Sequence, residues 1–264
     1  MAKKEEQALA TTTGDELTAG MTQEMLDQYG GAGTSQERED NLIPFLSVIQ
    51  KTSPIADPDS EQYDEEAKVG EIMNMATGER YDSLIVQPCH FAKADVEWTL
   101  RENGGGLVAQ HEIGAFPEED IHVDEKGNRI TPAGTQLVET KYHTVIAYPE
   151  GGEPFGAIVA LSSTGLKVSR TWMQLMNSFK VNTAKGRVTV PSFARKYRLS
   201  TEAKKNAKGT WRQLKVEDLG FITDESELLA GRELFDNMVA GNIKADNATA
   251  DQSAAEEDAE TPIG

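Results

Sequence analysis

The chain has 264 residues, of which 38% are hydrophobic and 27% are charged, and its formal net charge is −18. This length allows one large or two small domains with a sizeable core, whereas the acidic total excludes a surface that coats duplex nucleic acid everywhere. No apolar run has the length of a membrane span, and the first residues contain no apolar signal-peptide core. The single cysteine, Cys89, excludes an internal disulfide and indicates a reducing cytoplasm.

The N-terminal part of the chain divides into an arm, an apolar cluster and a loop. Residues 1–40 are mainly polar, small and charged, which predicts a flexible arm. The folded domain is expected to begin at residue 41, because the first dense apolar cluster follows at residues 42–49. Residues 51–68 contain prolines and acids with few apolar side chains, which predicts a surface loop.

Strand patterns dominate the next hundred residues. Residues 84–91 form an apolar-rich run, and apolar and polar residues alternate at 94–100 with a period of two. This alternation places Trp98 on the buried face of a strand. The next expected segments are an acidic excursion at 112–135 and strands at 136–148 and 155–161.

The period changes to that of a helix at residues 165–179. Apolar residues recur there at spacings of three and four, which predicts a helix with Lys167 and Arg170 on its outer face. A loop is expected at 180–190, and strands at 193–203 and 209–221. Trp211 is in phase with polar neighbours in the second of these strands, so we expect an exposed tryptophan.

The C-terminal part is predicted to hold one helix and a tail. Asp224 and Glu227 form a helix-capping pair, and the helix they begin should end near Gly241. Beyond Lys244 there is no basic residue, and acids lie among Ala, Ser and Thr, which predicts a disordered acidic tail.

These elements together predict a mostly β (α+β) chain. A helix between strands three and four of a small antiparallel barrel is the arrangement of the OB-fold. We therefore expect an OB-fold-like antiparallel barrel with a C-terminal helix and disordered termini. The expected domains are an arm at 1–40, an OB-like single-strand-binding domain at 41–222, the C-terminal helix at 223–244 and the tail at 245–264.

Basic residues are concentrated between Gly165 and Lys215. This run holds thirteen Lys and Arg against one acid, Glu202, so its formal charge is +12 and the rest of the chain carries −30. Interleaved aromatics and cations are what a single-stranded nucleic-acid site needs, although solvated cations and core aromatics are the alternative. The predicted nucleic-acid-binding residues are Lys167, Arg170, Lys185, Arg187, Phe193, Arg195, Lys196, Tyr197, Arg198, Lys204, Lys205, Lys208, Trp211 and Arg212.

Strand alternation leaves one choice open in this run. Arg195 and Tyr197 fall on one face of their strand, and Lys196 and Arg198 fall on the other. The sequence does not decide which face meets nucleic acid.

No constellation of catalytic residues is found. The four histidines are scattered, and neither a His-Glu-x-x-His motif nor a Cys-x-x-Cys pair occurs. We expect no enzymatic activity, no metal and no cofactor. The acidic cluster Glu118-Glu119-Asp120 could serve a two-metal nuclease, but a solvated loop is the more frequent role of such clusters in an acidic chain.

Several segments resemble a family of tailed-phage single-stranded DNA-binding proteins. The matching segments cover about residues 40–220 and are Asn41–Gln50, Thr52–Pro54, Val86–Phe91, Val96–Trp98, Arg101-Glu102, Gly104–Gly106, Leu161–Thr164, Leu166-Lys167, Ser169-Arg170 and Trp172. The resemblance implies an OB-like core that protects single strands during phage DNA replication and recombination. It also implies an acidic tail that recruits replisome proteins such as a polymerase or a helicase/primase.

The tail residues expected to bind such partners are Asp251, Glu256, Glu257, Asp258 and Glu260. The tail ends in Thr261–Gly264 without a terminal aromatic residue, which departs from the usual end of such tails. The expected function is thus a non-catalytic single-stranded DNA-binding protein in the cytoplasm of an infected host cell. It is not expected to bind a membrane, and a homodimer is one option for its assembly. The alternatives are a recombination mediator or strand-annealing protein, a metal-dependent nuclease and a virion-associated protein.

Overall fold

The computed structural model describes Thr22, Met25 and residues 42–125, 127–206 and 209–245. Most of the predicted arm and nearly all of the predicted acidic tail, including its five partner-binding acids, lie outside the described residues. The described residues between Leu42 and Ala245 form one compact unit, which contains the C-terminal helix as well as the β-sheet.

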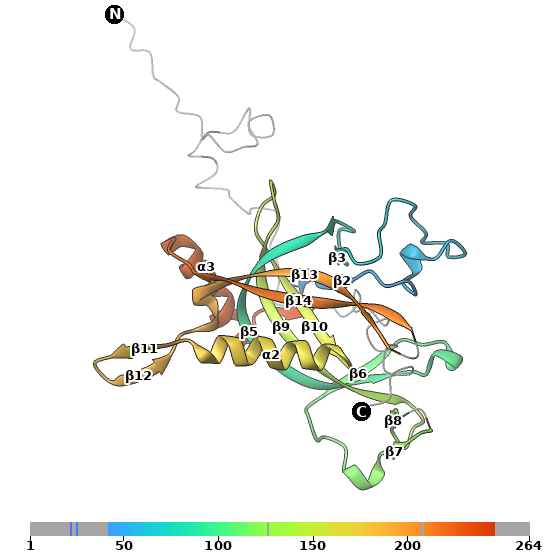
Figure 1. Cartoon of the computed structure of the whole chain (residues 1–264). Helices are drawn as coiled ribbons and strands as arrows, with labels where there is room; N and C mark the ends of the chain where they lie inside the picture. The colour runs from blue at the N-terminus through green and yellow to red at the C-terminus, as the bar shows by residue number, and fades with distance from the viewer. Residues whose placement is uncertain (1–21, 23–24, 26–41, 126, 207–208, 246–264) are drawn as a thin grey trace, which may run out of the picture. The chain divides into compact units, whose positions relative to one another are not determined.

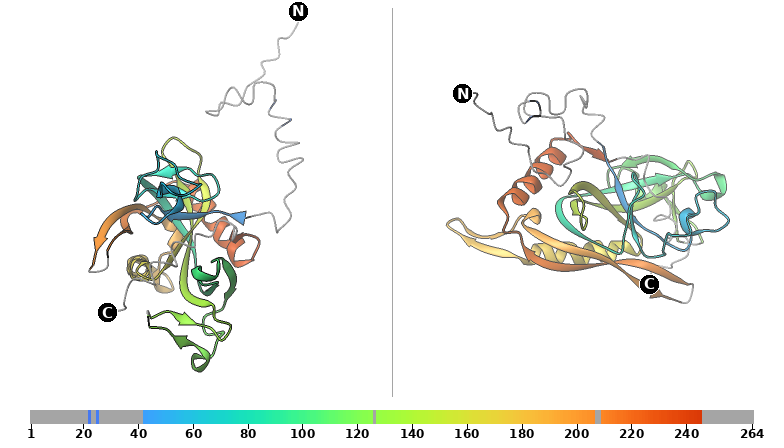
Figure 2. Two further views of the ribbon diagram at one scale, coloured as in Figure 1. Left: turned by 90° about the vertical axis from the view of Figure 1, so that its right-hand side faces the viewer. Right: turned by 90° about the horizontal axis from the view of Figure 1, so that it is seen from above.

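Most of this unit is one sheet that curls into a half-barrel (Figures 1 and 2). Its strand order is β14-β13-β5-β9-β10-β2-β3-β4, and all neighbours are antiparallel except β2 and β10. The bounds of these strands are β2 Phe45–Val48, β3 Ile72–Asn74, β4 Arg80–Tyr81, β5 Ser83–Trp98, β9 Gln136–Tyr148, β10 Phe155–Ser162, β13 Arg195–Lys205 and β14 Thr210–Phe221.

Short strands extend the half-barrel or lie beside it. Strand β6 (Leu107–His111) pairs with the end of β5, and β8 (Arg129–Ile130) joins β7 (His122–Val123) to β9. Two separate pairs are the parallel β1 (Leu42–Ile43) with β15 (Lys244–Ala245), and the hairpin of β11 (Lys180–Thr183) with β12 (Gly186–Thr189). The 3-10 helices are η1 Pro54–Ala56, η2 Arg101–Asn103, η3 Glu118–Asp120 and η4 Ser192–Ala194.

Helix α2 (Gly165–Ser178) follows β10 and packs against both β10 and β14. It inserts Trp172 and Met176 into the largest core cluster, which also contains Val145 and Tyr197 from the curled sheet. This helix therefore fills the half-barrel, since its apolar stripe completes a core that the sheet leaves open.

Helix α3 (Glu225–Val239) packs against β5 and η4. Its N-cap is Asp224, whose side chain accepts hydrogen bonds from the backbone N–H groups of Ser226 and Glu227, as the capping pair predicts. Gly231 is buried on the sheet side of α3, and a Cβ atom there would lie 2.2 Å from Gln87 Nε2. Only glycine permits this close approach of helix and sheet.

The predicted fold class is confirmed: the chain is mostly β, its sheet is barrel-like, and helix α2 lies between β10 and β13 in the chain, followed by the β11–β12 hairpin. Within the described residues the sheet remains a half-barrel, because β14 and β4 at its two ends are not paired with each other.

Two local predictions were wrong. The two expected strands at 84–91 and 94–100 form the single strand β5, since the residues between them continue the pairing with β9. The expected loop at 180–190 is the β11–β12 hairpin, whose β-branched residues favour extended backbone.

Candidate nucleic-acid interface

The cations of the basic run fall into two groups in the structure. Four of them form ion pairs with acids: Arg195 with Asp218, Lys196 with Glu227, Arg198 with Glu217 and Lys204 with Glu202. Eight others form no ion pair with any described residue, and these are Lys167, Arg170, Lys180, Lys185, Arg187, Lys205, Arg212 and Lys215. The thirteenth, Lys208, lies outside the described residues.

Arg195 is a structural residue and not a free cation. Its side chain is 7% exposed and donates two hydrogen bonds to the carboxylate of Asp218 on β14. The guanidinium carbon also lies 3.5 Å from the ring centroid of Phe179 and 4.1 Å from that of Phe221. Its charge is thus neutralised and covered, so its predicted contact with nucleic acid is withdrawn.

Lys196 is held between the sheet and α3. Its Nζ lies 2.6 Å from Glu227 Oε1 and 3.9 Å from the ring centroid of Tyr148. The pairs of Arg198 and Lys204 are more exposed, with N–O distances of 3.4 and 2.7 Å. Exposed pairs are weak, so these two cations can exchange a carboxylate for a phosphate, whereas Lys196 is bound to the fold.

Two of the aromatic residues predicted to stack on bases are packed inside the protein and are not accessible to a base. Tyr197 has an exposed fraction of 0% and packs edge-on against Trp172, so it belongs to the core. Phe193 precedes β13 in η4 and packs against Phe235 of α3, with ring centroids 6.0 Å apart. Both are corrected to packing residues, because β13 turns Tyr197 toward α2 and the sheet interior, and η4 places Phe193 against α3.

Trp211 is half-buried, which corrects the expected exposed tryptophan. The predicted alternation along this strand is confirmed, because buried Leu214 lies on the face of β14 opposite to Trp211. The strand face of Trp211 is nevertheless covered in part, since Gln213, two residues on, donates a hydrogen bond to the carbonyl of Thr164 beside α2. The indole Nε1 is buried and has no described hydrogen-bond partner. Trp211 remains a stacking candidate through the exposed part of its ring.

The eight unpaired cations lie on three connected elements. Lys167 and Arg170 are exposed on α2, the β11–β12 hairpin that follows α2 carries three more, and the β13–β14 hairpin that α2 packs against carries the rest. These elements adjoin along one side of the half-barrel (Figure 1). We call these eight residues the basic band.

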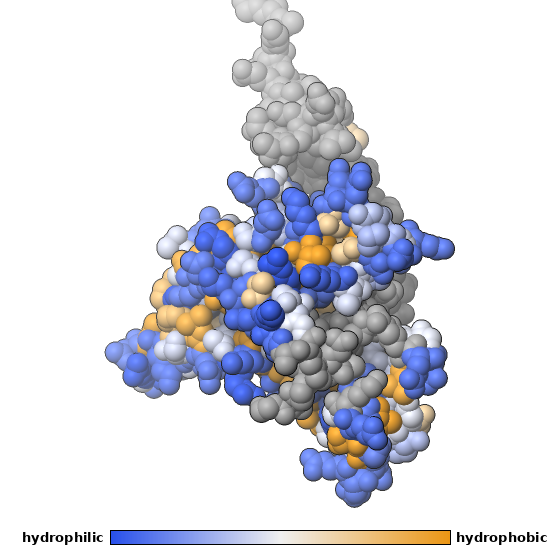
Figure 3. All heavy atoms as spheres, turned by 45° about the vertical axis from the view of Figure 1, so that its right-hand side comes forward, coloured by the Kyte–Doolittle hydropathy of each residue, from blue (hydrophilic) through white to orange (hydrophobic). Residues whose placement is uncertain are grey.

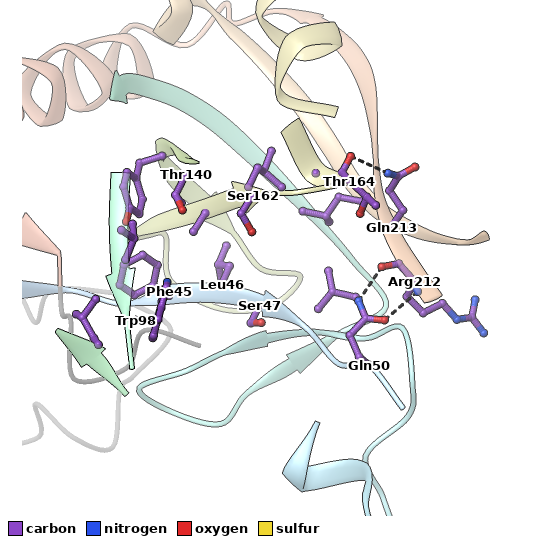
Figure 4. Close-up of a pocket in the computed structure, with 18 of the residues that line it drawn as sticks. Phe45, Leu46, Ser47, Gln50, Trp98, Thr140, Ser162, Thr164, Arg212 and Gln213 are labelled. Atoms are coloured by element: carbon purple, nitrogen blue, oxygen red, sulfur yellow. Dashed lines mark hydrogen bonds between the residues drawn. The ribbon is translucent and has the colours of Figure 1, made fainter. Parts of the chain in front are cut away.

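A cleft adjoins the basic band at the end of the half-barrel. It encloses a volume of about 100 Å³ between β2, β5, β6, β9, β10, β14 and the start of α2. Figure 4 shows Phe45 and Trp98 at one end of the cleft, and Gln50 and Arg212 at the other.

The apolar end of the cleft has an aromatic wall that sequence analysis missed. Phe45, Trp98 and Tyr142 come from three different strands, and the rings of Phe45 and Tyr142 are 6.2 Å apart. Trp98 is 7% exposed, as expected of a core position, but it also lines the cleft. Burial raises the pKa of the Tyr142 phenol, which therefore stays protonated as a potential donor. The alternation of apolar and polar residues predicted only that such residues are buried. It gave no indication that residues from three different strands lie together.

Gln50 and Arg212 form the polar end of the cleft. The Gln50 side chain donates from Nε2 to the Arg212 carbonyl at 2.7 Å, and its Oε1 accepts from the Arg212 N–H at 2.9 Å. The Arg212 side chain is left free of described ion pairs and points away from the cleft in Figure 4. Arg212 thus belongs to both the cleft and the basic band.

The histidines and acids do not form a metal site in the described part of the chain, where no group of three or more His, Cys, Asp or Glu side chains converges. Glu118, Glu119 and Asp120 lie in the exposed 3-10 helix η3. His111 Nε2 donates a hydrogen bond to Glu97 Oε2 at 2.7 Å, and the hydrogen bonds of Thr135 and His111 hold the pKa of Glu97 below its usual value. Among the described residues no helix is long and apolar enough to cross a membrane.

The half-barrel, the basic band and the cleft define a mostly β protein with a candidate polyanion-binding side. A family model described as Pam3 phage gp34-like protein matches residues 12–244. The chain belongs to this bacteriophage family. No curated protein and no solved structure gives a significant match.

Proposed function

We propose that this protein binds single-stranded DNA without catalysing a reaction and protects it during phage DNA replication and recombination in the infected cell. The observation that carries the proposal is a band of eight unpaired cations that adjoins an aromatic-walled cleft. Arg212 is common to both, so a strand that follows the band reaches the cleft at this residue.

The charge pattern supports contact with phosphates. Lys167 and Arg170 are exposed on α2, and Lys205 and Arg212 lie on the neighbouring β13–β14 hairpin. Cations without a carboxylate partner attract a polyanion without first losing an ion pair, and they release counterions from the strand on binding. The basic band covers only one side of an otherwise acidic protein. Such a band can bind a single DNA strand along one path, whereas a protein that encloses a duplex needs positive charge on all sides of it.

The cleft supports a preference for unpaired bases. Its wall of Phe45, Trp98 and Tyr142 lies inside the cleft at the end away from Gln50 and Arg212, so only a base that has left its stack can approach it. Contacts between bases and aromatic rings tolerate any sequence, because every base has a π-face. The proposed binding is therefore selective for single strands with little preference among bases.

The acidic tail is proposed to bind partner proteins of the phage replisome. Its acids at 251–260 lie outside the described residues, and this part of the proposal rests on the charge of the sequence and on the resemblance to single-stranded DNA-binding proteins.

Fluorescence anisotropy with a labelled single strand and its matched duplex tests the proposal, with and without magnesium. We expect tight binding of the single strand, at least tenfold weaker binding of the duplex, and no cleavage on a gel after incubation with magnesium. Arg212→Ala should weaken single-strand binding. The matched control is Arg232→Ala, since Arg232 is an exposed arginine of α3 that is paired with Asp236.

Equal binding of duplex and single strand would contradict the role of the cleft. Cleavage of the strand would favour the nuclease alternative, and equal affinity of the Arg212 and Arg232 variants would remove the link between the cleft and the basic band. Annealing of complementary strands would favour the strand-annealing alternative.

A further inference from the structure

The β11–β12 hairpin is exposed to solvent on both of its faces. All eight residues of the two strands are exposed, and the hairpin projects from the body of the protein (Figure 1). Val181 and Val188 are direct cross-strand partners and are 44% and 41% exposed. A lone two-stranded hairpin is marginally stable in water, so an apolar pair on one of its faces is a surface that needs a partner.

An open apolar cavity lies beside the base of this hairpin. It has a volume of about 360 Å³ and is bounded by β5, α2, α3 and the segment that follows β12. Phe235 and Val239 of α3 form part of its wall and are 37% and 64% exposed. Figure 3 shows apolar residues exposed between hydrophilic ones at the lower left, the end of the molecule that carries the hairpin.

The ionisable groups that line this cavity are uncharged at neutral pH. Burial lowers the pKa of His143 to about 3 and lowers that of His90, and it raises the pKa of the Cys89 thiol to about 12. Met173 and Met176 line the α2 side, and methionine adapts its shape to an incoming apolar group. The cavity therefore suits aliphatic side chains.

The charges around the two surfaces are complementary. The hairpin carries Lys180, Lys185 and Arg187 and no acid. Helix α3 carries four acids, of which Glu227 and Asp236 are paired with Lys196 and Arg232, whereas Glu225 and Glu233 form no ion pair with a described residue. A basic hairpin is therefore attracted to the cavity that α3 borders, in addition to the fit of its apolar face.

The hairpin of the same chain is not placed to enter this cavity. Val190, directly after β12, lines the cavity and donates its N–H to the carbonyl of Phe179 at 3.0 Å, which closes the base of the hairpin. Entry would require the hairpin to fold back at this point and break that hydrogen bond. A hairpin from a second copy meets no such restriction.

We propose that two copies of this chain form a two-fold symmetric dimer in which each hairpin packs Val181 and Val188 into the cavity of its partner. The hairpin base and the cavity share Val190, so a two-fold axis beside this residue brings both hairpins to both cavities at once. Lys180 and Arg187 lie on the opposite face of the hairpin and remain open in the dimer.

Sedimentation equilibrium over a range of concentrations, without nucleic acid, tests the proposal. The wild-type chain should be a dimer, and Val188→Glu should raise the dimer dissociation constant by about tenfold or more, because it places a charge at the centre of the contact. Val239→Glu, on the cavity side, should do the same. The matched control is Val123→Glu, since Val123 is a valine on the β7–β8 hairpin with 57% exposure, and this variant should dimerise as the wild type does.

An equimolar mixture of the Val188→Glu and Val239→Glu variants provides the decisive measurement. A mixed dimer pairs the intact hairpin of one variant with the intact cavity of the other, so the mixture should associate more tightly than either variant alone. A monomeric wild type would overturn the proposal, as would a dimer that Val188→Glu leaves unchanged or a mixture that gains nothing. None of these results depends on binding of single-stranded DNA, so this proposal and the proposed function fail independently.

Discussion

The cations of strand β13 and those of helix α2 belong to one basic run but have different surroundings. Arg195 and Lys196 on β13 are held by Asp218 and Glu227, whereas Lys167 and Arg170 on α2 have no described acid beside them. The acids that neutralise Arg195 and Lys196 come from β14 and α3, and both follow the basic run in sequence. Local charge in a sequence is therefore an upper limit on the charge that a folded surface offers.

The largest expected effect concerns the contrast between the two faces of α2, because the outer face carries free cations and the inner face packs against a histidine that burial keeps uncharged. Its outer face carries Lys167 and Arg170, while His143 stacks on Trp172 at its inner face and is kept neutral by burial and by the charge of Lys141, with a pKa of about 3. An unfolded histidine has a pKa of about 6.5, so the unfolded chain binds the extra proton between these values. The free energy of unfolding should be insensitive to His143 above pH 6.5 and fall by up to about 1.4 kcal/mol per pH unit as pH drops toward 3.

Urea denaturation at several pH values between 3 and 8 measures this loss. His143→Gln should flatten the pH dependence, while His122→Gln, which alters an exposed histidine, should leave it unchanged. An equal slope for wild type and His143→Gln would show that His143 does not resist protonation.

The second test removes a paired cation. Arg195→Ala should lower the free energy of unfolding by about 2–4 kcal/mol, because it leaves Asp218 without its partner and removes the cation–π contacts of the guanidinium with Phe179 and Phe221. Arg187→Ala, an exposed cation of the same run, should change stability by no more than about 0.5 kcal/mol. Denaturation by urea distinguishes the two, and similar losses in both variants would contradict the division into structural and free cations.

The third test concerns stacking beside the free cations. Trp211→Ala should weaken single-strand binding by about 1–3 kcal/mol, the usual contribution of one stacked base. The control is Tyr63→Ala, an exposed aromatic residue outside the basic run. Anisotropy titrations measure both, and tryptophan fluorescence that a strand quenches equally in wild type and Trp211→Ala would assign stacking to another residue, with Trp98 of the cleft as the next candidate.

The fourth test compares free and paired cations by salt dependence. Each phosphate neutralised on a single strand contributes about 0.7 to the slope of log affinity against log salt, so Lys167→Ala with Arg170→Ala should reduce the slope by about 1.4. Arg198→Ala with Lys204→Ala should reduce it by less than half as much, since these cations are paired. Equal reductions would mean that the ion pairs on β13 open when a strand binds.

The smallest expected effect concerns the acidic tail. A flexible acidic segment attached to a basic surface competes at high effective concentration with an incoming strand. Deleting residues 246–264, which leaves β15 intact, should tighten single-strand binding by a few fold at about 50 mM salt and hardly at all at 200 mM, because salt screens the competition. Unchanged affinity at low salt would leave solubility as the role of the tail charge.

Elements with strong local signals were predictable from sequence, whereas contacts between distant elements were not. The bounds of β9, the start of α2 and the Asp224 cap agree with the sequence patterns because each depends on neighbours within a few residues. The pairing of Arg195 with Asp218 depends on the register of β13 and β14, which shifts between Lys196 and Tyr197. Such an irregularity changes which residues face each other and leaves no mark in hydrophobic periodicity.

The cleft was unpredictable for the same reason. Its aromatic wall joins β2, β5 and β9, whose order in the sheet is β5-β9-β10-β2 and not the order of the chain. Alternation identified Trp98 as buried, but it could not show that the same residue borders an opening.

The hydrogen bonds of Gln50 have a mechanical consequence for this opening. The end of β2 and strand β14 are connected there by one side chain that imitates a neighbouring strand, not by a ladder of backbone bonds. Two such bonds contribute about 1–3 kcal/mol, and one rotation of Gln50 breaks both at once. Separating two paired strands requires many bonds to break together, so this seam opens at a lower cost than a boundary between paired strands. On this side the width of the cleft therefore depends on the side-chain conformation of Gln50, while Gln213 joins β14 to Thr164 nearby.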